Sequence, residues 1–179
     1  MNNIINFSHE LLKDINNKKY AVDMTVGNGF DTLFLCQHYE FVYGFDIQQI
    51  AIDNTKKKLE ENKLDNHKLI LDSHSQIDKY INNGLDAIIY NLGYLPKGDK
   101  KITTKYEDVL ISLNKVIPLL DKGGRIVIIF YPGHESGKKE IENIIPFLNN
   151  LDQKEFEVIK YEFINQINEP PFLIAIERR

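Results

Sequence analysis

The sequence predicts an α/β fold, a doubly wound sheet of about seven mostly parallel strands that ends in an antiparallel hairpin. Three observations support this prediction. Short apolar runs alternate with amphipathic stretches along most of the chain, a glycine turn follows the first run, and the last two runs have no helix between them. With 179 residues and no repeat or linker, we expect a single domain over residues 1–179.

The first predicted strand and the turn after it organise the chain. Residues 20–23 are expected to form a buried strand, and Gly27 and Gly29 a tight turn before a helix that begins near Asp31. Glycine permits positive φ and lets a ligand approach the backbone closely. This strand, turn and helix are typical of a site for a nucleotide-like ligand. A dinucleotide fingerprint, however, would have a third glycine where Thr32 stands.

The remaining elements follow in a regular order. A helix over residues 8–12, with Ser8 as its N-cap, is expected before the first strand. Later helices are expected over residues 32–38, 47–62, 104–120 and 137–149. Later strands are expected over residues 41–46, 68–72, 85–91, 125–130, 155–163 and 171–177. The run over 85–91 is apolar almost throughout, which is typical of a central parallel strand.

Composition limits the class of protein. The chain is 42% hydrophobic and 27% charged, which is ordinary for a globular protein, and it has neither a membrane-span pattern nor a signal-peptide pattern. Its one cysteine, Cys36, lies in an apolar helix, so we expect a packed thiol, no disulfides and a cytoplasmic location. The five histidines show no paired spacing, so no metal site is expected. A net charge of −4 argues against a broad basic surface but leaves room for a local basic patch.

Polar residues close four of the predicted strands, namely Asp23, Asp46, Asp72 and Asn91. In a doubly wound sheet the ligand lies outside the carboxyl ends of the strands, so we expect these side chains at one edge. Asp23 suits a cationic group, such as the amino acid part of S-adenosylmethionine. Asp46 is placed to accept hydrogen bonds from ribose hydroxyls, and Asp72, with His74 close by, to meet an adenine amino group. Capping of the following helix is the alternative for Asp46 and Asp72.

The segment Asn91-Leu92-Gly93-Tyr94-Leu95-Pro96 is predicted to form a rigid lip over the pocket. The Asn91 oxygen can accept a hydrogen bond from an amino group, and the Tyr94 ring can stack on a planar base. The alternative is a turn with a buried tyrosine.

The next segment is basic. It holds four lysines in nine residues, Lys97, Lys100, Lys101 and Lys105, which are expected to bind phosphate unless they form a solvated loop. Thr103 and Thr104 either cap the next helix or touch an RNA backbone. His134, after the fifth strand, either contacts substrate and assists proton removal or is a structural loop residue.

These residues together resemble class I S-adenosylmethionine-dependent methyltransferases, which have a Rossmann-like sheet. Asn91 to Tyr94 is similar to their Asn-Pro-Pro-Tyr amine-methylating motif with both prolines replaced. More closely, the chain resembles the YtqB-like family, labelled rRNA methylases. The matching segments are residues 21–33, 43–48, 91–96, 98–100, 102–105, 133–135 and 170–173. Met24 departs from the family pattern, which usually has alanine there.

The resemblance implies the activity of MnmM-type enzymes, N-methylation of 5-aminomethyl-2-thiouridine at the tRNA wobble position. The implied partner is the tRNA anticodon loop, with no membrane, and a homodimer stays open. Contacts with the cofactor, S-adenosylmethionine, are expected from Asp23, Thr25, Gly27, Asn28, Gly29, Asp31, Thr32, Asp46, Gln48, Asp72, His74 and Asn91. Substrate contacts are expected from Tyr94, Lys100, Lys101, Thr103, Thr104, Lys105 and His134. Catalysis is expected from Asn91, Tyr94 and His134.

Three other functions stay open at this point. An NAD(P)-dependent oxidoreductase agrees with Asp46 but not with the missing third glycine. A non-catalytic RNA-binding module would not need the polar strand ends. A methyltransferase acting on rRNA or on a small-molecule amine is disfavoured only by the resemblance.

Overall fold

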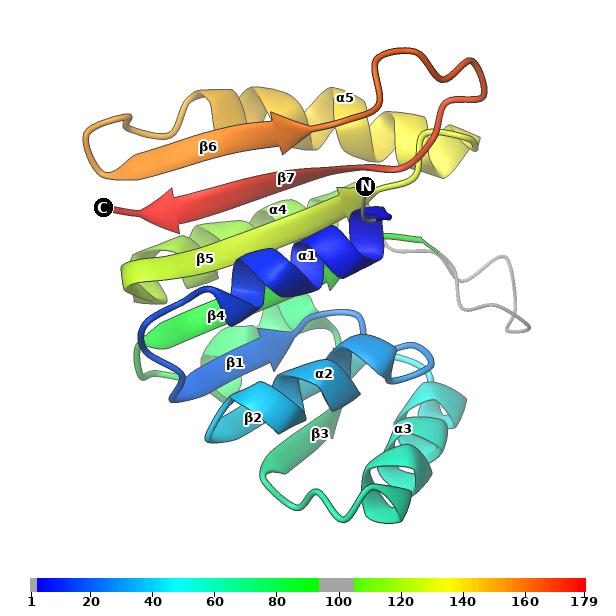
Figure 1. Ribbon diagram of the computed structural model, residues 1–179, viewed down its shortest axis with the longest axis vertical. Helices are drawn as coiled ribbons and strands as arrows, with labels where there is room; N and C mark the ends of the chain where they lie inside the picture. Colours follow the sequence, from blue (N-terminus) through cyan, green and yellow to red (C-terminus); the bar gives the residue numbers. More distant parts are fainter. Residues whose placement is uncertain (1–2, 94–104) are drawn as a thin grey trace.

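The computed structural model describes residues 3–93 and 105–179. Its strands are β1 (Tyr20–Asp23), β2 (Phe41–Asp46), β3 (His67–Leu71), β4 (Leu85–Asn91), β5 (Leu120–Phe130), β6 (Phe156–Tyr161) and β7 (Phe172–Arg178). They form one sheet in the order β3-β2-β1-β4-β5-β7-β6 (Figure 1). Strands β1 to β5 pair in parallel, whereas β7 runs antiparallel to both β5 and β6. The predicted doubly wound sheet with a terminal hairpin is therefore confirmed.

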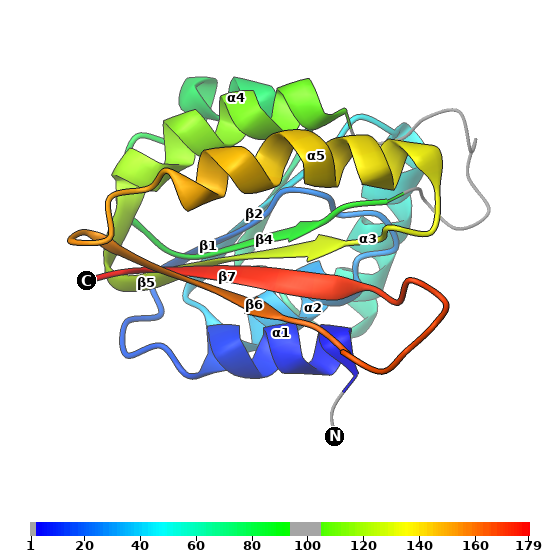
Figure 2. The ribbon, with the colours of Figure 1, turned by 90° about the horizontal axis from the view of Figure 1, so that it is seen from above.

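Helices cover both faces of the sheet. They are α1 (Ile4–Lys13), α2 (Phe30–His38), α3 (Gln49–Glu61), α4 (Tyr106–Val116) and α5 (Glu135–Asn149), with short 3-10 helices at His74–Lys79 and Ile117–Leu119. Helices α4 and α5 lie on one face, and α1 and α2 lie on the other (Figure 2). Over the described part of the chain, no helix has both the length and the apolar character needed to cross a membrane.

The central strands are buried on both faces. Ile88 and Ile89 are neighbours in β4 and are both fully buried, but they belong to two different hydrophobic clusters. One cluster contains residues of α4 and α5, and the other contains residues of α1 and α2. Successive side chains of a strand point to opposite faces, so a strand covered on both sides needs a continuous apolar run. This explains the apolar pattern over residues 85–91.

The first helix begins earlier than the sequence predicts. Asn3 is its N-cap, and the Asn3 side chain accepts a hydrogen bond of 2.8 Å from the backbone N–H of Asn6. The prediction that Ser8 caps this helix is wrong, because Ser8 lies buried inside the helix and its hydroxyl donates to the carbonyl of Ile5. Asparagine is as good an N-cap as serine, so residue type alone does not choose between the two positions.

The helix predicted over residues 104–120 and the strand predicted over residues 125–130 also have different bounds. Proline has no N–H to donate and its ring clashes with the preceding turn, so Pro118 prevents the helix from continuing. Helix α4 ends at Val116, and β5 already begins at Leu120. The other predicted helices and strands agree with the structure to within two residues at each end.

Glu140 is a buried carboxyl group on α5. It is 2% exposed, and its Oε2 atom has no hydrogen-bond partner among the described residues. Burial raises the pKa of Glu140 from 4.5 to about 7. The folded chain therefore holds this proton at pH values where the unfolded chain has released it, and the stability that the neutral carboxyl gives is lost as the pH rises from about 4.5 to about 7.

We expect Glu140→Gln to stabilise the fold at high pH only. The free energy of unfolding should rise by about 2 kcal/mol at pH 8.5 and by less than about 0.5 kcal/mol at pH 4, where the carboxyl is neutral in both states. Urea unfolding at the two pH values measures this difference. Glu142→Gln, an exposed change on the same helix, should have no such effect. A gain that does not depend on pH would contradict the prediction.

Candidate active site

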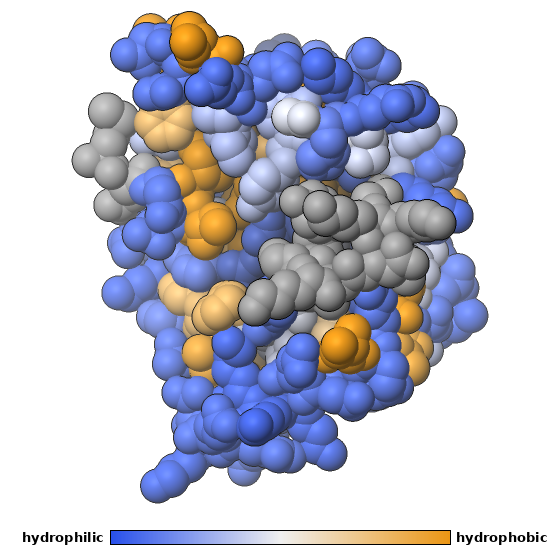
Figure 3. Space-filling view, turned by 90° about the vertical axis from the view of Figure 1, so that its right-hand side faces the viewer, coloured by the Kyte–Doolittle hydropathy of each residue, from blue (hydrophilic) through white to orange (hydrophobic). Residues whose placement is uncertain are grey.

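A cavity of about 730 Å³ opens where the parallel strands end. The side of the molecule on which these ends lie is largely hydrophilic, with separate hydrophobic patches (Figure 3). The predicted site residues that line the cavity are Thr25, Gly27, Asn28, Asp31, Asp46, Gln48, Asp72, His74, Asn91, Lys105 and His134. The predictions for Tyr94, Lys97, Lys100, Lys101, Thr103 and Thr104 fall outside the described residues.

Three predicted cofactor ligands, Asp23, Gly29 and Thr32, are not part of the cavity wall. The Asp23 carboxylate is fully buried and accepts hydrogen bonds from the Thr25 backbone N–H at 3.0 Å and the Thr32 hydroxyl at 2.6 Å. Gly29 has a φ of +73°, and a Cβ atom at this position would lie 2.4 Å from Thr55. The structure therefore places Asp23 and Thr32 behind the glycine turn, where their hydrogen bond supports its shape, and Gly29 within the turn, with its Cα facing Thr55.

Asp46 lines the cavity and anchors two loops. Its Oδ2 atom accepts a 2.9 Å hydrogen bond from the Gly27 backbone N–H, and its Oδ1 atom accepts one of the same length from Gln48. The N-cap of α3 is Gln48, so capping of the helix does not explain Asp46. Burial raises the pKa of Asp46. The carboxylate keeps acceptor capacity for a further donor.

Asp72 and His74 lie on the cavity wall after β3. Asp72 accepts 2.8 Å hydrogen bonds from the Ser73 backbone N–H and the Tyr80 hydroxyl, while Ser73 is the cap of the 3-10 helix. Burial lowers the pKa of His74 to about 4, so its ring is neutral at neutral pH. The Nδ1 atom of His74 is buried and has no partner among the described residues, and the ring packs edge-on against Tyr90. This pair of residues suits an uncharged base that offers hydrogen bonds.

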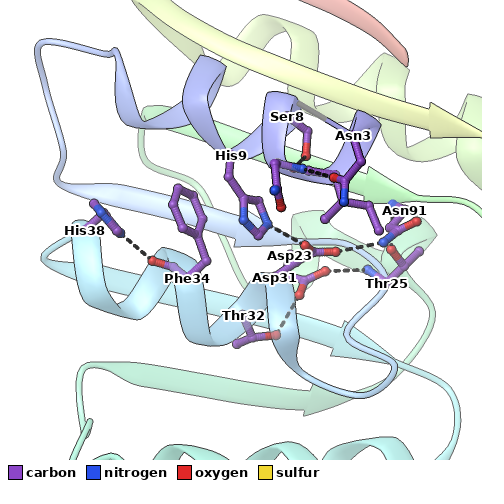
Figure 4. A network of polar contacts seen from close by, with 12 residues as sticks. Asn3, Ser8, His9, Asp23, Thr25, Asp31, Thr32, Phe34, His38 and Asn91 are labelled. Atoms are coloured by element: carbon purple, nitrogen blue, oxygen red, sulfur yellow. Dashed lines mark hydrogen bonds and ion pairs between the residues drawn. The ribbon is translucent and has the colours of Figure 1, made fainter. Parts of the chain in front are cut away.

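Four polar side chains form a continuous chain of contacts at the end of β4, and three of them, His9, Asp31 and Asn91, are labelled in Figure 4. The Asn91 Nδ2 atom donates to Asp31 Oδ2 at 2.9 Å, and the Tyr131 hydroxyl donates to Asn91 Oδ1 at 2.8 Å. The second oxygen of Asp31, Oδ1, lies 2.6 Å from the Nε2 atom of His9. The backbone N–H of Asn91 donates to the Thr25 hydroxyl at 2.8 Å. Segments that are distant in sequence thereby meet at one point of the cavity.

His9 and Tyr131 belong to this chain, but the sequence analysis does not assign either a role. Tyr131 had an available signal, because it directly follows β5 and such positions face the ligand in parallel sheets. Burial raises the pKa of Tyr131 to about 12, so its hydroxyl stays a donor at neutral pH. His9 had no local signal, because its partner Asp31 is 22 residues away and the two meet only when α1 packs beside α2.

The Asn91 oxygen was predicted to hold an amine N–H, and the structure already gives that oxygen one partner, Tyr131. One acceptor position remains on the oxygen. The Asp31 carboxylate lines the cavity beside it and also keeps one acceptor position on each oxygen. The two side chains together can therefore receive the hydrogens of a primary amine.

His134 lines the cavity and is also the N-cap of α5. Its Nδ1 atom accepts a 3.1 Å hydrogen bond from the Gly137 backbone N–H and lies 2.9 Å from the Ser136 hydroxyl. A proton added to Nδ1 would break this cap. The structure therefore supports a structural role for His134, in addition to its place on the wall.

Carboxylates are the most numerous charged groups on the described cavity wall. They belong to Asp31, Asp46, Asp72, Asp108 and Glu169, and the wall also includes Lys105. Such a wall attracts a cationic ligand and repels the two negative charges of a dinucleotide pyrophosphate. A cofactor that carries a sulfonium and an ammonium group therefore fits these residues, and NAD(P) does not. Among the described residues, no three His, Cys, Asp or Glu side chains are grouped to hold a metal ion.

Comparison with known proteins agrees with this chemistry. Residues 42–177 match the family model described as "Putative rRNA methylase". A crystal structure of a "putative rRNA-methylase" from Clostridium thermocellum is 42% identical, with a TM-score of 0.97 over 100% of this chain and 99% of that one. A putative methyltransferase from Streptococcus mutans, solved in complex with SAH, is 39% identical, with a TM-score of 0.93 over 100% and 99% of the two chains.

A curated relative from Arabidopsis thaliana is named as a chloroplastic tRNA (mnm5s2U34)-methyltransferase. It is 29% identical over 172 residues, which cover 88% of this chain and 63% of the relative. The chain thus spans less than two thirds of that protein. The family match covers most of the sequence, and the fold agrees with the two bacterial structures over their full length. The chain therefore belongs to the "Putative rRNA methylase" family of S-adenosylmethionine-dependent methyltransferases.

Proposed function

We propose that this methyltransferase transfers the methyl group of S-adenosylmethionine to the exocyclic amine of 5-aminomethyl-2-thiouridine at the tRNA wobble position. The observation that carries the proposal is the cluster of Asp31, Asn91 and Tyr131, which presents a carboxylate, an amide and a hydroxyl at one point of the cavity. Such a cluster suits a primary amine. The activity named for the Arabidopsis relative supports the choice of nucleoside.

The rest of the wall suits the cofactor. We assign the ribose hydroxyls to Asp46 and the adenine amino group to Asp72, with Thr25, Asn28 and Gln48 lining the space around them. When bound, S-adenosylmethionine supplies a methyl group that is already activated on a sulfonium. The protein then has to position a neutral amine and accept its proton. The lone pair of the substrate nitrogen forms the new N–C bond as the S–C bond breaks. The electron pair of the broken S–C bond stays on sulfur, which becomes a thioether.

The proposed partner is the anticodon loop of tRNA. Its bases are single-stranded and can enter a cavity without the opening of a duplex. Lys105 lies on the cavity wall and is proposed to contact phosphate with the lysines at 97, 100 and 101, while Tyr94 packs on the uracil ring. The proposal includes one domain over residues 1–179 and a cytoplasmic location, with which the single buried Cys36 agrees. Sedimentation of the purified protein would test for a homodimer.

The decisive experiment supplies the purified protein with labelled S-adenosylmethionine and with tRNA from cells that lack this enzyme. The tRNA is then digested and its nucleosides are separated by mass. We expect conversion of 5-aminomethyl-2-thiouridine to its N-methyl form. If the label is transferred to rRNA or to small amines offered in parallel assays, but not to tRNA, the proposed substrate is wrong and the methyltransferase reaction is kept. Absence of S-adenosylmethionine binding would overturn the enzyme proposal itself.

A further inference from the structure

We propose that Asp31 and His9 form a proton-accepting pair for the substrate amine, with Asp31 in contact with the amine and His9 as a positioning residue behind it. This inference rests on the proposed function, because an aminomethyl group is mostly protonated at neutral pH and an ammonium has no lone pair. The sequence analysis assigns Asp31 to the cofactor and names His134 as the candidate for proton removal. The contacts of His9 point to a different acceptor.

The position of Asp31 is the first argument. Its side chain is 8% exposed, lines the cavity and is held from both sides, by Asn91 on Oδ2 and by His9 on Oδ1. A carboxylate fixed in this way cannot rotate away from an ammonium in the cavity. Burial, together with the charge of Asp31, raises the pKa of Asp23 to about 7, so Asp31 lies close enough to this second carboxyl group to act on it electrostatically.

The orientation of His9 is the second argument. Its ring stacks on Phe34 with a centroid distance of 3.9 Å and an interplanar angle of 4°, so the imidazole is fixed with Nε2 at 2.6 Å from Asp31. The His9 side chain is 19% exposed, whereas Asp31 is nearly buried. A proton accepted at Asp31 thus has a titratable neighbour that reaches solvent.

Charged and titratable groups of several neighbouring elements lie around the pair. On α2, the His38 ring lies with its centroid 4.5 Å from that of Phe34, the ring on which His9 stacks. Asp23 on β1 and Tyr131 after β5 interact electrostatically with Asp31. At the far end of α1, Arg125 of β5 binds the carbonyl of Leu11 and pairs with Glu177 of β7.

The chemical step balances without a further reagent. One N–H bond of the substrate ammonium breaks, and its electron pair stays on nitrogen as the lone pair that attacks the methyl group. The proton passes to an Asp31 oxygen and then across the 2.6 Å contact to Nε2 of His9, in the tautomer whose ring hydrogen is on Nδ1. The imidazolium formed in this way releases a proton to water. The methylated product carries one positive charge, so each turnover releases one proton.

The test compares His9→Gln with wild type in single-turnover methylation of the aminomethyl-thiouridine tRNA from pH 6 to 9.5. Glutamine can still donate a hydrogen bond to Asp31 but cannot accept a proton. We expect the methylation rate to fall about 30-fold at pH 7 and to recover to within about threefold at pH 9.5, where the amine loses its proton unaided. Affinity for S-adenosylmethionine should change less than about threefold, since positioning of the cofactor is not affected.

Two further variants keep the result interpretable. His38→Gln removes the other imidazole that contacts Phe34, and its rate and pH profile should match wild type. Asp31→Asn, which keeps the shape of the side chain but not its charge, should lower the methylation rate about 100-fold at pH 7.

A loss of rate in His9→Gln that is equal at all pH values, or that appears as weaker S-adenosylmethionine binding, would overturn the inference. Wild-type protein that leaves this tRNA unmethylated would instead overturn the proposed function and, with it, the role of the pair.

Discussion

Asn91→Ala is expected to lower the rate of methyl transfer about 10³-fold while S-adenosylmethionine binds within about threefold of wild type. The substitution removes only the amide, which bridges Asp31 and Tyr131. The backbone N–H that Asn91 donates to Thr25 remains, so the edge of β4 should keep its place. This is the largest effect that we predict for a single side chain.

The expected size follows from the contacts that are lost together. A partly buried carboxylate oxygen and a partly buried hydroxyl each lose a partner, which costs about 1–3 kcal/mol per group if the cavity stays closed to water. Asp31 is then held by His9 alone and can turn from the amine. A shift of about 1 Å at a reacting group costs about 10²-fold in rate, and the direct contact of the amide with the amine adds to this.

Single-turnover methylation and titration with S-adenosylmethionine separate the two quantities. Asn114→Ala is a matched control, because Asn114 is exposed on α4 and its amide donates to the carbonyl of Leu110 within the same helix. This control should leave both quantities unchanged. If Asn91→Ala weakens S-adenosylmethionine binding as much as it slows transfer, Asn91 holds the cofactor and not the amine.

Most of the fold can be predicted from this sequence because its signals are local. The apolar run of β4 identifies a strand covered on both faces, and the glycine turn marks the junction between β1 and α2. The errors arise where two local signals compete. Asn3 and Ser8 are equally good caps, and only the packing of α1 selects the first. The predicted helix before β5 ran past Pro118, although proline ends a helix, so its C-terminal boundary was placed too late.

The site divides in a similar way. Asp46, Asp72 and Asn91 line the cavity, because parallel strands end on one side of the sheet. Asp23 satisfies the same rule but is buried, since Thr25 and Thr32 enclose its carboxylate. The contact between His9 and Asp31 depends on how α1 packs beside α2. The residues around His9 and those around Asp31 carry no sequence pattern that would indicate this contact.

Asp46→Ala is expected to weaken S-adenosylmethionine binding about 300-fold and to leave the fold intact. A carboxylate that accepts two hydroxyl groups of the ribose contributes about 1.5–3 kcal/mol for each charged hydrogen bond, and the loss of both gives a change of about 3.4 kcal/mol. The same carboxylate holds the Gly27 and Gln48 backbone N–H groups, so its removal also loosens two loops of the cavity wall.

Calorimetric titration with S-adenosylmethionine measures this loss, and thermal unfolding of the unliganded protein shows whether the fold is kept. Asp53→Ala is the control, because Asp53 is an exposed acid on α3 whose carboxylate, among the described residues, accepts from the Gln49 side chain alone, at 2.8 Å. Since both variants remove one negative charge from the same region, long-range attraction of a cationic cofactor falls similarly in each. An equal loss of affinity in the two variants would therefore assign Asp46 a general electrostatic effect and contradict a direct contact with the ribose.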